Sequence, residues 1–262
     1  MKRITSLLFV PAKRKMLEKI PSFSADAFVI DLEDSIPVCE KQQALSATID
    51  FLATHDRENC YVRVDRALMS EQLSQLRRAD FRGYMIPKIE SADVLLSYAE
   101  HFKEREIVAL VETPRGLANI KEIAECPFVT ALAFGAEDYT AFCGMANRMD
   151  GLGYHKSRIV MYAKANGKRV YDTPCFNLED AGVAEAETKL AVELGFDGKL
   201  AIHPKMIPMI VRAFGDFDFA YLKSVIEQYE AQGAAVLKLG EMVFEKMHID
   251  HFKRILKENN YR

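Results

Sequence analysis

Eight short apolar runs, separated by longer amphipathic stretches, constrain the fold of this chain more than any other feature. The runs occupy residues 6–10, 27–34, 61–65, 84–89, 107–113, 131–138, 169–173 and 199–203. Most of them are continuously apolar, which is typical of parallel strands that are covered by helices. The stretches between them are long enough for a helix each, so the spacing predicts βα units rather than hairpins.

The simplest way to close eight such units is an α/β fold of the (β/α)8 TIM-barrel type with appended C-terminal helices. The chain has 262 residues, and a typical barrel of this type uses about 250. A doubly wound open sheet is the alternative. It would need fewer strands and a glycine-rich phosphate-binding turn, which the sequence lacks.

The pattern becomes purely helical after His203-Pro204, with expected helices at 219–232, 234–247 and 250–259. We therefore expect a barrel domain over residues 1–215 and a helical extension over 216–262. Apolar residues recur at helical spacing in this extension. Such a stripe favours packing on the barrel or on a neighbouring subunit, and hence a homo-oligomer.

Charge and cysteine content exclude several classes of function. The 35 basic and 38 acidic residues give a net charge of -3, which provides no broad basic field for nucleic acid. The five cysteines are odd in number and lack CxxC spacing, as in a reduced cytoplasmic protein without structural zinc. No run of 18 apolar residues and no signal peptide is present, so we expect no membrane partner.

Polar residues collect where the eight expected strands end. The ends contain Pro11-Ala12 followed by Lys13 and Arg14, Asp31 to Asp34, Arg63 to Asp65, Pro87-Lys88, Glu112, Asp138, Asp172-Thr173 and His203-Pro204. In a barrel the carboxyl ends of all strands meet at one face, where catalytic residues gather. Eight polar ends in register indicate a functional site at that face.

Glu112 and Asp138 close two successive apolar runs. A carboxylate in this position is costly to bury without a partner, so each is expected at the rim of the sheet. Two acids on neighbouring strand ends form an oxygen site suited to Mg²⁺, which prefers one or two carboxylates with water and substrate oxygens. The alternative is that both are N-caps of the helices that follow. These two residues by themselves do not decide between the alternatives.

Seven motifs, in order, resemble the citrate lyase β-subunit family of the HpcH/HpaI aldolase superfamily. They are Ser-Leu-Leu-Phe-Val-Pro (6–11), Val-Ile-Asp-Leu-Glu-Asp (29–34), Val-Arg-Val-Asp (62–65), Ile-Pro-Lys-Ile-Glu (86–90), Val-Glu-Thr-Pro-Arg-Gly (111–116), Phe-Gly-Ala-Glu-Asp-Tyr (134–139) and Gly-Lys-Leu-Ala-Ile-His-Pro (198–204). The resemblance covers about the first 215 residues. It implies a TIM barrel, Mg²⁺ as cofactor, and aldol-type cleavage of a 3-hydroxyacyl thioester on CoA or an acyl carrier protein.

By the same resemblance, Glu112 and Asp138 hold the metal, Arg63 binds the substrate, and the protein forms a trimer. Glu112 is expected to take part in substrate binding as well. The chain departs from the family pattern at Ala12, Asp65, Lys205 and Phe244. The last departure replaces an acid that the malyl- and citramalyl-thioester lyases carry in their tail, so the proton-transfer group stays open.

The remaining polar ends suggest further roles. Arg63 is suited to grip a carboxylate or a developing oxyanion, and its alternative is an ion pair with Asp31 or Asp65. Asp31 is expected to orient Arg63 or a metal-bound water, whereas Asp34 is interpreted as a helix cap. Lys88 is expected to hold a carboxylate in the catalytic site or to pair with a nearby acid.

Two basic residues after the first strand extend this site. Lys13 and Arg14 are candidates for the phosphates of CoA, and the alternative is a solvated helix face. The leading hypothesis is thus a Mg²⁺-dependent carbon–carbon lyase of a citryl-, citramalyl- or malyl-type thioester. The alternatives are a class II aldolase of free 2-keto acids, and a catalytically weak subunit that binds a metabolite or serves assembly.

Overall fold

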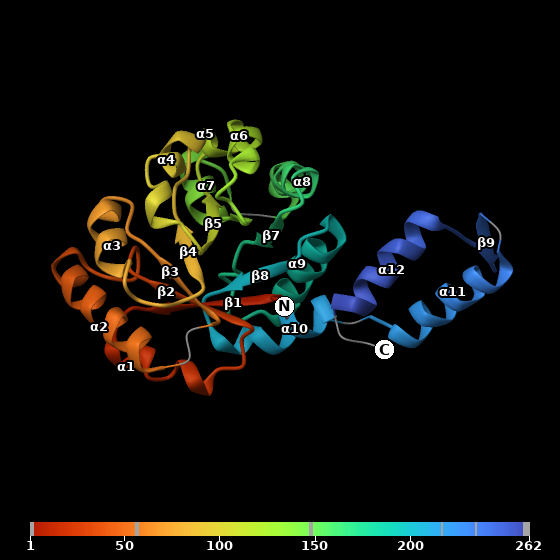
Figure 1. Ribbon diagram of the computed structural model, residues 1–262, viewed down its shortest axis with the longest axis horizontal. Helices are drawn as coiled ribbons and strands as arrows, with labels where there is room; N and C mark the ends of the chain where they lie inside the picture. The colour runs from red at the N-terminus through yellow and green to blue at the C-terminus, as the bar shows by residue number, and fades with distance from the viewer. Residues whose placement is uncertain (1–2, 56–57, 147–148, 216, 234, 259–262) are drawn as a thin grey trace. The chain divides into compact units, whose positions relative to one another are not determined.

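The structure of the chain, a computed structural model, describes residues 3–55, 58–146, 149–215, 217–233 and 235–258. Its main feature is a closed barrel of eight parallel strands in the order β1 to β8, in which β8 pairs with β1 (Figure 1). The strands are β1 Ser6–Pro11, β2 Ala27–Asp31, β3 Cys60–Arg63, β4 Gly83–Ile86, β5 Glu106–Val111, β6 Ala131–Phe134, β7 Arg169–Asp172 and β8 Gly198–Ala201. The expected TIM barrel is confirmed.

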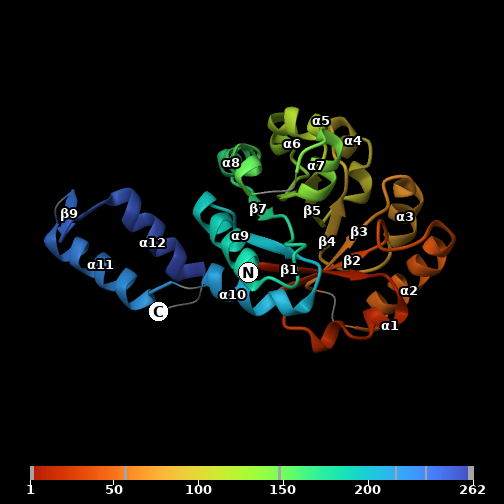
Figure 2. The ribbon, with the colours of Figure 1, turned by 180° about the vertical axis from the view of Figure 1, so that it is seen from behind.

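Helices connect consecutive strands and lie outside the barrel, as the opposite views of Figures 1 and 2 show. The α-helices of this part are α1 Arg14–Leu17, α2 Lys41–Thr54, α3 Met69–Leu76, α4 Ala92–Leu96, α5 Pro114–Ala118, α6 Ile120–Glu125, α7 Ala136–Cys143, α8 Met149–Ala165, α9 Ala181–Leu194 and α10 Ile207–Gly215. Short 3-10 helices occur at η1 Ile20–Ser22, η2 Val38–Glu40, η3 Ala99–His101 and η4 Pro204–Met206. No helix in the described part of the chain is long and apolar enough to cross a membrane.

Two apolar layers hold the barrel together. Successive side chains of a strand point to opposite faces, so each strand supplies both layers. On β2, for example, Val29 packs inside the barrel, whereas Phe28 and Ile30 pack between the strands and the helices. This use of both faces explains why the strands are continuous apolar runs in the sequence.

Seven of the eight strands end earlier than the apolar runs predicted; the exception is β1, which extends to Pro11. β2 ends at Asp31 rather than at residue 34, and β6 ends at Phe134 rather than at 138. Asp138 therefore lies in the first turn of helix α7 and not on a strand. The physical reason is that an acidic residue in the first turn of a helix is favoured by the helix dipole.

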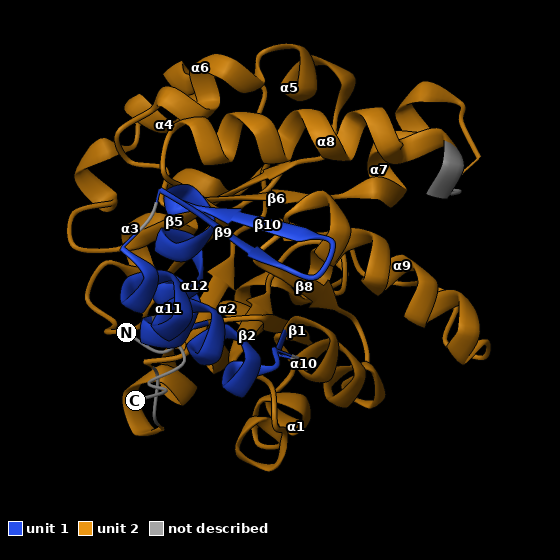
Figure 3. Ribbon diagram, turned by 90° about the vertical axis from the view of Figure 1, so that its right-hand side faces the viewer, with its two compact units in different colours: residues 1–3, 215–262 blue, residues 4–214 orange. Residues whose placement is uncertain are grey.

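The chain divides into two compact units, which Figure 3 shows in different colours. One unit is Ile4–Phe214, which contains the barrel, and the other holds the described residues from Gly215 onward together with Arg3. The second unit contains helix α11 (Phe219–Gln232), strands β9 (Val236–Leu239) and β10 (Met242–Glu245), and helix α12 (Lys246–Glu258). Whether the extension packs on the barrel or on a neighbouring subunit stays a prediction.

The helix expected over residues 234–247 is wrong, because the described residues of that segment form an antiparallel hairpin of β9 and β10. Leu239 pairs with Met242, which leaves a two-residue turn that begins at Gly240. Gly240 has a φ of 61°, which glycine adopts without strain and which suits such turns. Phe244 is buried in the small core of this unit with Leu237 and Ile249, so it has a packing role.

Candidate active site

The barrel interior changes from apolar to polar at the carboxyl ends of the strands. Leu7, Val29, Tyr61, Leu110 and Tyr171 point into the apolar interior. Because side chains alternate along a strand, the residues two positions further on also face the barrel axis. These residues are Phe9, Asp31, Arg63, Glu112 and Thr173, and all five line one cavity. The strand period thus brings together residues that are far apart in the sequence.

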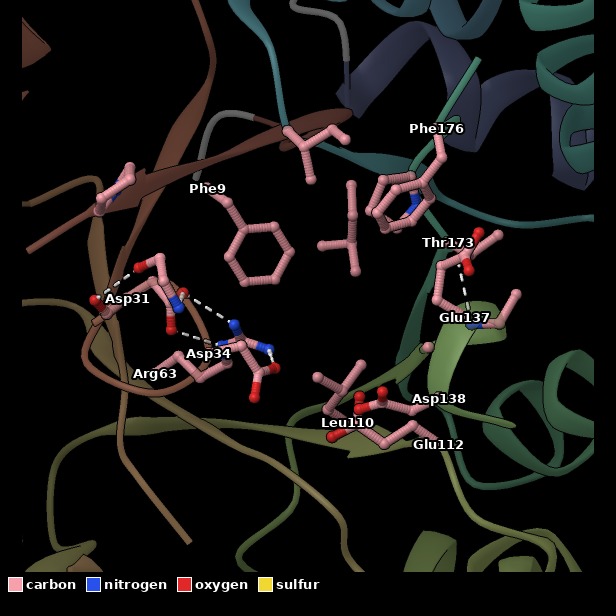
Figure 4. A pocket seen from close by; sticks show the side chains of 17 residues that line it. Phe9, Asp31, Asp34, Arg63, Leu110, Glu112, Glu137, Asp138, Thr173 and Phe176 are labelled. Atoms are coloured by element: carbon pink, nitrogen blue, oxygen red, sulfur yellow. Dashed lines mark hydrogen bonds and ion pairs between the residues drawn. The ribbon is translucent and has the colours of Figure 1, made fainter. Parts of the chain in front are cut away.

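The cavity at this mouth has a volume of about 450 Å³ (Figure 4). Its charged lining consists of Arg63 and the acids Asp31, Asp34, Glu112, Glu137 and Asp138, and its apolar lining includes Phe9, Leu110, Phe176, Leu200 and Ile202. Among these described lining residues the acids outnumber the single cation. An anionic substrate therefore needs additional positive charge at this site.

Glu112 is buried at the mouth, with 3% of its surface exposed. Its Oε1 accepts a hydrogen bond of 2.9 Å from the backbone N–H of Lys88. Burial raises the pKa of Glu112 to about 8, although Lys88 and Arg63 oppose this shift. The helix that follows is capped by Thr113, whose side chain accepts from the N–H of Gly116. The N-cap alternative is therefore wrong for Glu112.

Gly135 provides the room for the Glu112 carboxylate. A Cβ atom at residue 135 would lie 2.6 Å from Oε2 of Glu112, which is closer than real Cβ contacts. A residue with a side chain at this position would displace the carboxylate. The sequence motifs did not predict this role, although a glycine between Phe134 and Ala136 is a signal of close approach.

Asp138 lines the same cavity, and Figure 4 draws its carboxylate near that of Glu112. The charge of Asp138 is one of the causes that raise the pKa of Glu112, after burial and the charge of Glu33. The N-cap of helix α7 is Gly135, which has no side chain to cap it. Asp138 is therefore not an N-cap, and that alternative is also wrong.

Arg63 forms a two-point ion pair with Asp31, with 2.7 Å from Nε to Oδ1 and 2.8 Å from Nη2 to Oδ2. Burial alone would raise the pKa of Asp31, but Arg63 holds it below its ordinary value. Asp31 thus orients Arg63, as the sequence suggested. Asp65 does not pair with Arg63, because its carboxylate lies 2.5 Å from Nζ of Lys41.

The third nitrogen of Arg63 faces two more acids. Nη1 lies 3.1 Å from Oδ2 of Asp34 and 3.4 Å from Oε2 of Glu33. The interpretation of Asp34 as a helix cap is wrong, since Asp34 lines the cavity and its side chain caps neither η2 nor α2. The guanidinium of Arg63 also lies over the ring of Phe9, 4.9 Å from its centroid. Arg63 is consequently fixed from several sides.

Lys88 lies between two acids of the barrel mouth, Glu33 and Asp138. Its Nζ lies 2.9 Å from Oε1 of Glu33 and 3.4 Å from Oδ2 of Asp138. Burial alone would lower the pKa of Lys88, but the hydrogen bond to Glu33 and the charge of Glu112 hold it above its ordinary value. Its φ of 50° is in the left-handed region, where non-glycine residues are strained. Such strain commonly occurs at functional sites.

Lys13 and Arg14 lie outside the cavity that contains Glu112. Both line a cleft of about 280 Å³ beside helix α2. Lys13 pairs with Glu40 at 3.4 Å, and Arg14 pairs with Asp50 at 2.9 Å. These side chains are about half exposed or more, so their placement leaves them accessible to a ligand.

A buried ion cluster that the sequence pattern did not predict lies beside the site. Asp172 points away from the barrel axis, with its carboxylate 2.9 Å from Nζ of Lys156 and 2.6 Å from Nζ of Lys199. Burial alone would raise the pKa of Asp172, but the two lysines hold it below its ordinary value. All three residues are nearly or fully buried. The sequence offered little signal, because lysines are rarely buried.

Glu112 and Asp138 fit a hard divalent cation. Both offer oxygen donors, and the mouth combines six carboxylates with the cations Arg63 and Lys88. The described residues contain no group of three or more His, Cys, Asp or Glu side chains placed to hold a metal ion. A pair of carboxylates with remaining positions for water and substrate is the arrangement that Mg²⁺ favours.

Comparisons with known proteins agree with this geometry. The model of the HpcH/HpaI aldolase/citrate lyase family matches residues 5–204. A citrate lyase subunit beta-like protein of Deinococcus radiodurans is 31% identical over 94% of this chain and 92% of its own length. The mitochondrial citramalyl-CoA lyase of Homo sapiens is 29% identical, over 80% of this chain and 70% of its own. The solved structure of CitE from Mycobacterium tuberculosis with magnesium, acetoacetate and coenzyme A has a TM-score of 0.85 at 26% identity, and covers 98% of both chains.

Proposed function

The chain belongs to the HpcH/HpaI aldolase/citrate lyase family, and on this premise we propose that it cleaves a 3-hydroxyacyl thioester at the mouth of its barrel. It is a magnesium-dependent carbon–carbon lyase that acts on a CoA thioester of the citryl, citramalyl or malyl type. The products are an α-keto acid or glyoxylate and an acyl thioester. The observation that supports this most is the convergence of Glu112, Asp138 and Arg63 on one cavity.

Glu112 and Asp138 are the proposed ligands of Mg²⁺. Glu112 is held by the backbone N–H of Lys88, and Gly135 leaves space for its Oε2, so this carboxylate is fixed before a ligand arrives. When bound, Mg²⁺ supplies a Lewis acid for the oxygens of the α-keto or 2-hydroxy carboxylate, and it adds positive charge to an acidic site. Glu112 consequently lies beside the substrate as well as the metal.

Arg63 is the proposed group that binds the substrate. Asp31 holds the guanidinium through two N–H groups, which leaves Nη1 to face the cavity mouth. A substrate carboxylate or a developing oxyanion takes the place of Asp34 at Nη1, because Asp34 is the more exposed of the two acids there. Asp31 in this scheme keeps the guanidinium plane in position.

Lys88 is proposed to act as a permanent cation. Its pKa is held above the ordinary value by Glu33, so the side chain is an ammonium group and not the free amine that an imine requires. The ammonium lies between Glu33 and Asp138, where it offsets negative charge near the reacting atoms. Its role is therefore electrostatic.

Two regions outside the cavity are proposed to bind the carrier of the acyl group and a neighbouring subunit. Lys13 and Arg14 are placed in an accessible cleft and are proposed to bind the phosphates of CoA. An acyl carrier protein is the alternative carrier.

The extension exposes Met242, Val243 and Met247, and this apolar surface supports a homo-oligomer, for which we propose a trimer.

A substrate panel tests this function. Purified protein with Mg²⁺ is incubated with citryl-CoA, citramalyl-CoA and malyl-CoA, and release of oxaloacetate, pyruvate or glyoxylate is measured. We expect one of the three to be cleaved, and EDTA to stop the cleavage. The corresponding free acids and free 4-hydroxy-2-keto acids are run in parallel. Cleavage of only the free compounds, or of nothing in the panel, contradicts the proposal.

A further inference from the structure

Helix α7 carries Asp138 but lacks a cap of its own. Its N-cap is Gly135, which has no side chain, because the Glu112 carboxylate occupies the adjacent space. The first N–H groups of a helix have no partner within the helix, and a buried N–H without a partner is unfavourable. The start of α7 therefore needs a hydrogen-bond acceptor from elsewhere.

Thr173 supplies this acceptor from a different strand end. Its Oγ1 accepts a hydrogen bond of 3.1 Å from the backbone N–H of Ala136, the first residue of α7 (Figure 4). Thr173 is 5% exposed and lines the cavity two residues beyond Tyr171. This buried hydrogen bond joins the end of β7 to the first turn of α7, which carries Asp138.

The residue before Thr173 is anchored firmly. Asp172 forms ion pairs with Lys156 of α8 and Lys199 of β8, at 2.9 and 2.6 Å. These contacts join the end of β7 to the neighbouring strand and to a surrounding helix. Thr173 is thus placed by a buried ion cluster that the proposed chemistry does not otherwise use.

We infer that Thr173 is a positioning residue that fixes the first turn of α7 and thereby presents Asp138 to the divalent cation. This inference rests on the proposed function for the identity of the metal ligand. Thr173 acts through Asp138, since the Ala136 N–H occupies its hydroxyl oxygen. Residues that support a metal ligand commonly contribute about 10- to 100-fold to metal affinity.

The test compares Thr173→Val, which keeps the shape and removes the acceptor, with Thr173→Ser, which keeps the hydroxyl. Binding of Mn²⁺ to the full chain is titrated by electron paramagnetic resonance. We expect Thr173→Val to weaken Mn²⁺ binding about tenfold or more, and Thr173→Ser to restore it to within about threefold. Thr48→Val is the matched control, because Thr48 is also buried and its hydroxyl bonds a backbone carbonyl, that of Ala44, in α2.

A second readout keeps this test separate from the proposed function. Amide hydrogen exchange over residues 134–140 is measured without added metal, and Thr173→Val is expected to speed it, whereas Thr48→Val leaves it unchanged. Unaltered exchange together with Mn²⁺ binding like that of the wild type overturns the inference. If the wild type binds Mn²⁺ but cleaves no thioester, the proposed function fails while these two measurements still decide the role of Thr173.

Discussion

Replacing Glu112 by glutamine is expected to abolish thioester cleavage and to weaken Mn²⁺ binding at least about 100-fold, or about 2.8 kcal/mol. Glutamine keeps the size of the side chain and an oxygen that accepts from the N–H of Lys88, but it has no charge for the cation. Burial already disfavours the ionised form of Glu112, as its raised pKa shows, so the variant is expected to fold. Mn²⁺ titration and the thioester assay measure the two effects.

The pH dependence of metal binding gives this variant a second signature. Because the pKa of Glu112 is raised to about 8, a cation must displace a proton from it below that pH. The Mn²⁺ affinity of the wild type should fall, by up to about tenfold per pH unit, as the pH decreases from 8. Glu112→Gln should lose this dependence. Glu33→Gln is the control, since Glu33 is a buried acid of the same mouth. If both variants lost Mn²⁺ affinity and its pH dependence equally, a specific role of Glu112 as a metal ligand would be contradicted.

Replacing Arg63 by lysine is expected to lower kcat/KM by about 100-fold or more, as loss of a single transition-state donor commonly does. Lysine keeps the charge but cannot hold Asp31 through two N–H groups and present a third to the substrate. Mn²⁺ affinity should stay within about threefold, because Arg63 is not a metal ligand. Steady-state kinetics and the Mn²⁺ titration separate these outcomes.

Arg82→Lys is the matched control for this change. Arg82 is also largely buried and paired, with 2.8 Å from Nη2 to Oε1 of Glu106, but it lies at the opposite end of the barrel. Its replacement should lower stability and leave kcat/KM nearly unchanged. If Arg63→Lys retained normal kinetics, or if both variants lost activity equally, substrate binding by Arg63 would be refuted. Methionine is less suitable at residue 63, because it leaves Asp31 buried without its cation, at a cost of about 3–5 kcal/mol.

The sequence predicted the barrel because buried parallel strands leave a direct signal, namely short apolar runs at regular intervals. It placed Asp31, Arg63 and Glu112 at the barrel mouth because each stands where an apolar run ends. Their expected roles in metal and substrate binding came from the family motifs. In the structure each of the three follows an inward-facing apolar residue by one strand period. The end of β6 was placed too late, because a run of small and apolar residues does not reveal where a strand passes into a helix. Asp138 therefore lines the expected cavity at the barrel mouth, but it lies on helix α7 and not on a strand.

Other features depend on neighbours in space that the linear pattern does not identify. Gly135 matters because of the carboxylate of Glu112, and Thr173 because of the N–H of Ala136. A helix was predicted where the hairpin at Gly240 lies, because short apolar runs fit both the helical and the strand period. Phe244 packs in the core of the extension, which gives a structural reason for an apolar residue where the family resemblance led us to expect an acid.

The central claim is that Glu112 and Asp138 together hold a divalent cation next to Arg63. The most direct test is a crystal structure of the protein with Mn²⁺ and pyruvate, in which anomalous scattering locates the metal. The account predicts one Mn²⁺ within about 2.2 Å of an oxygen of each carboxylate, with the keto acid bound between the metal and Arg63. A metal bound elsewhere, or carboxylates of Glu112 and Asp138 that turn away from it, would contradict the account.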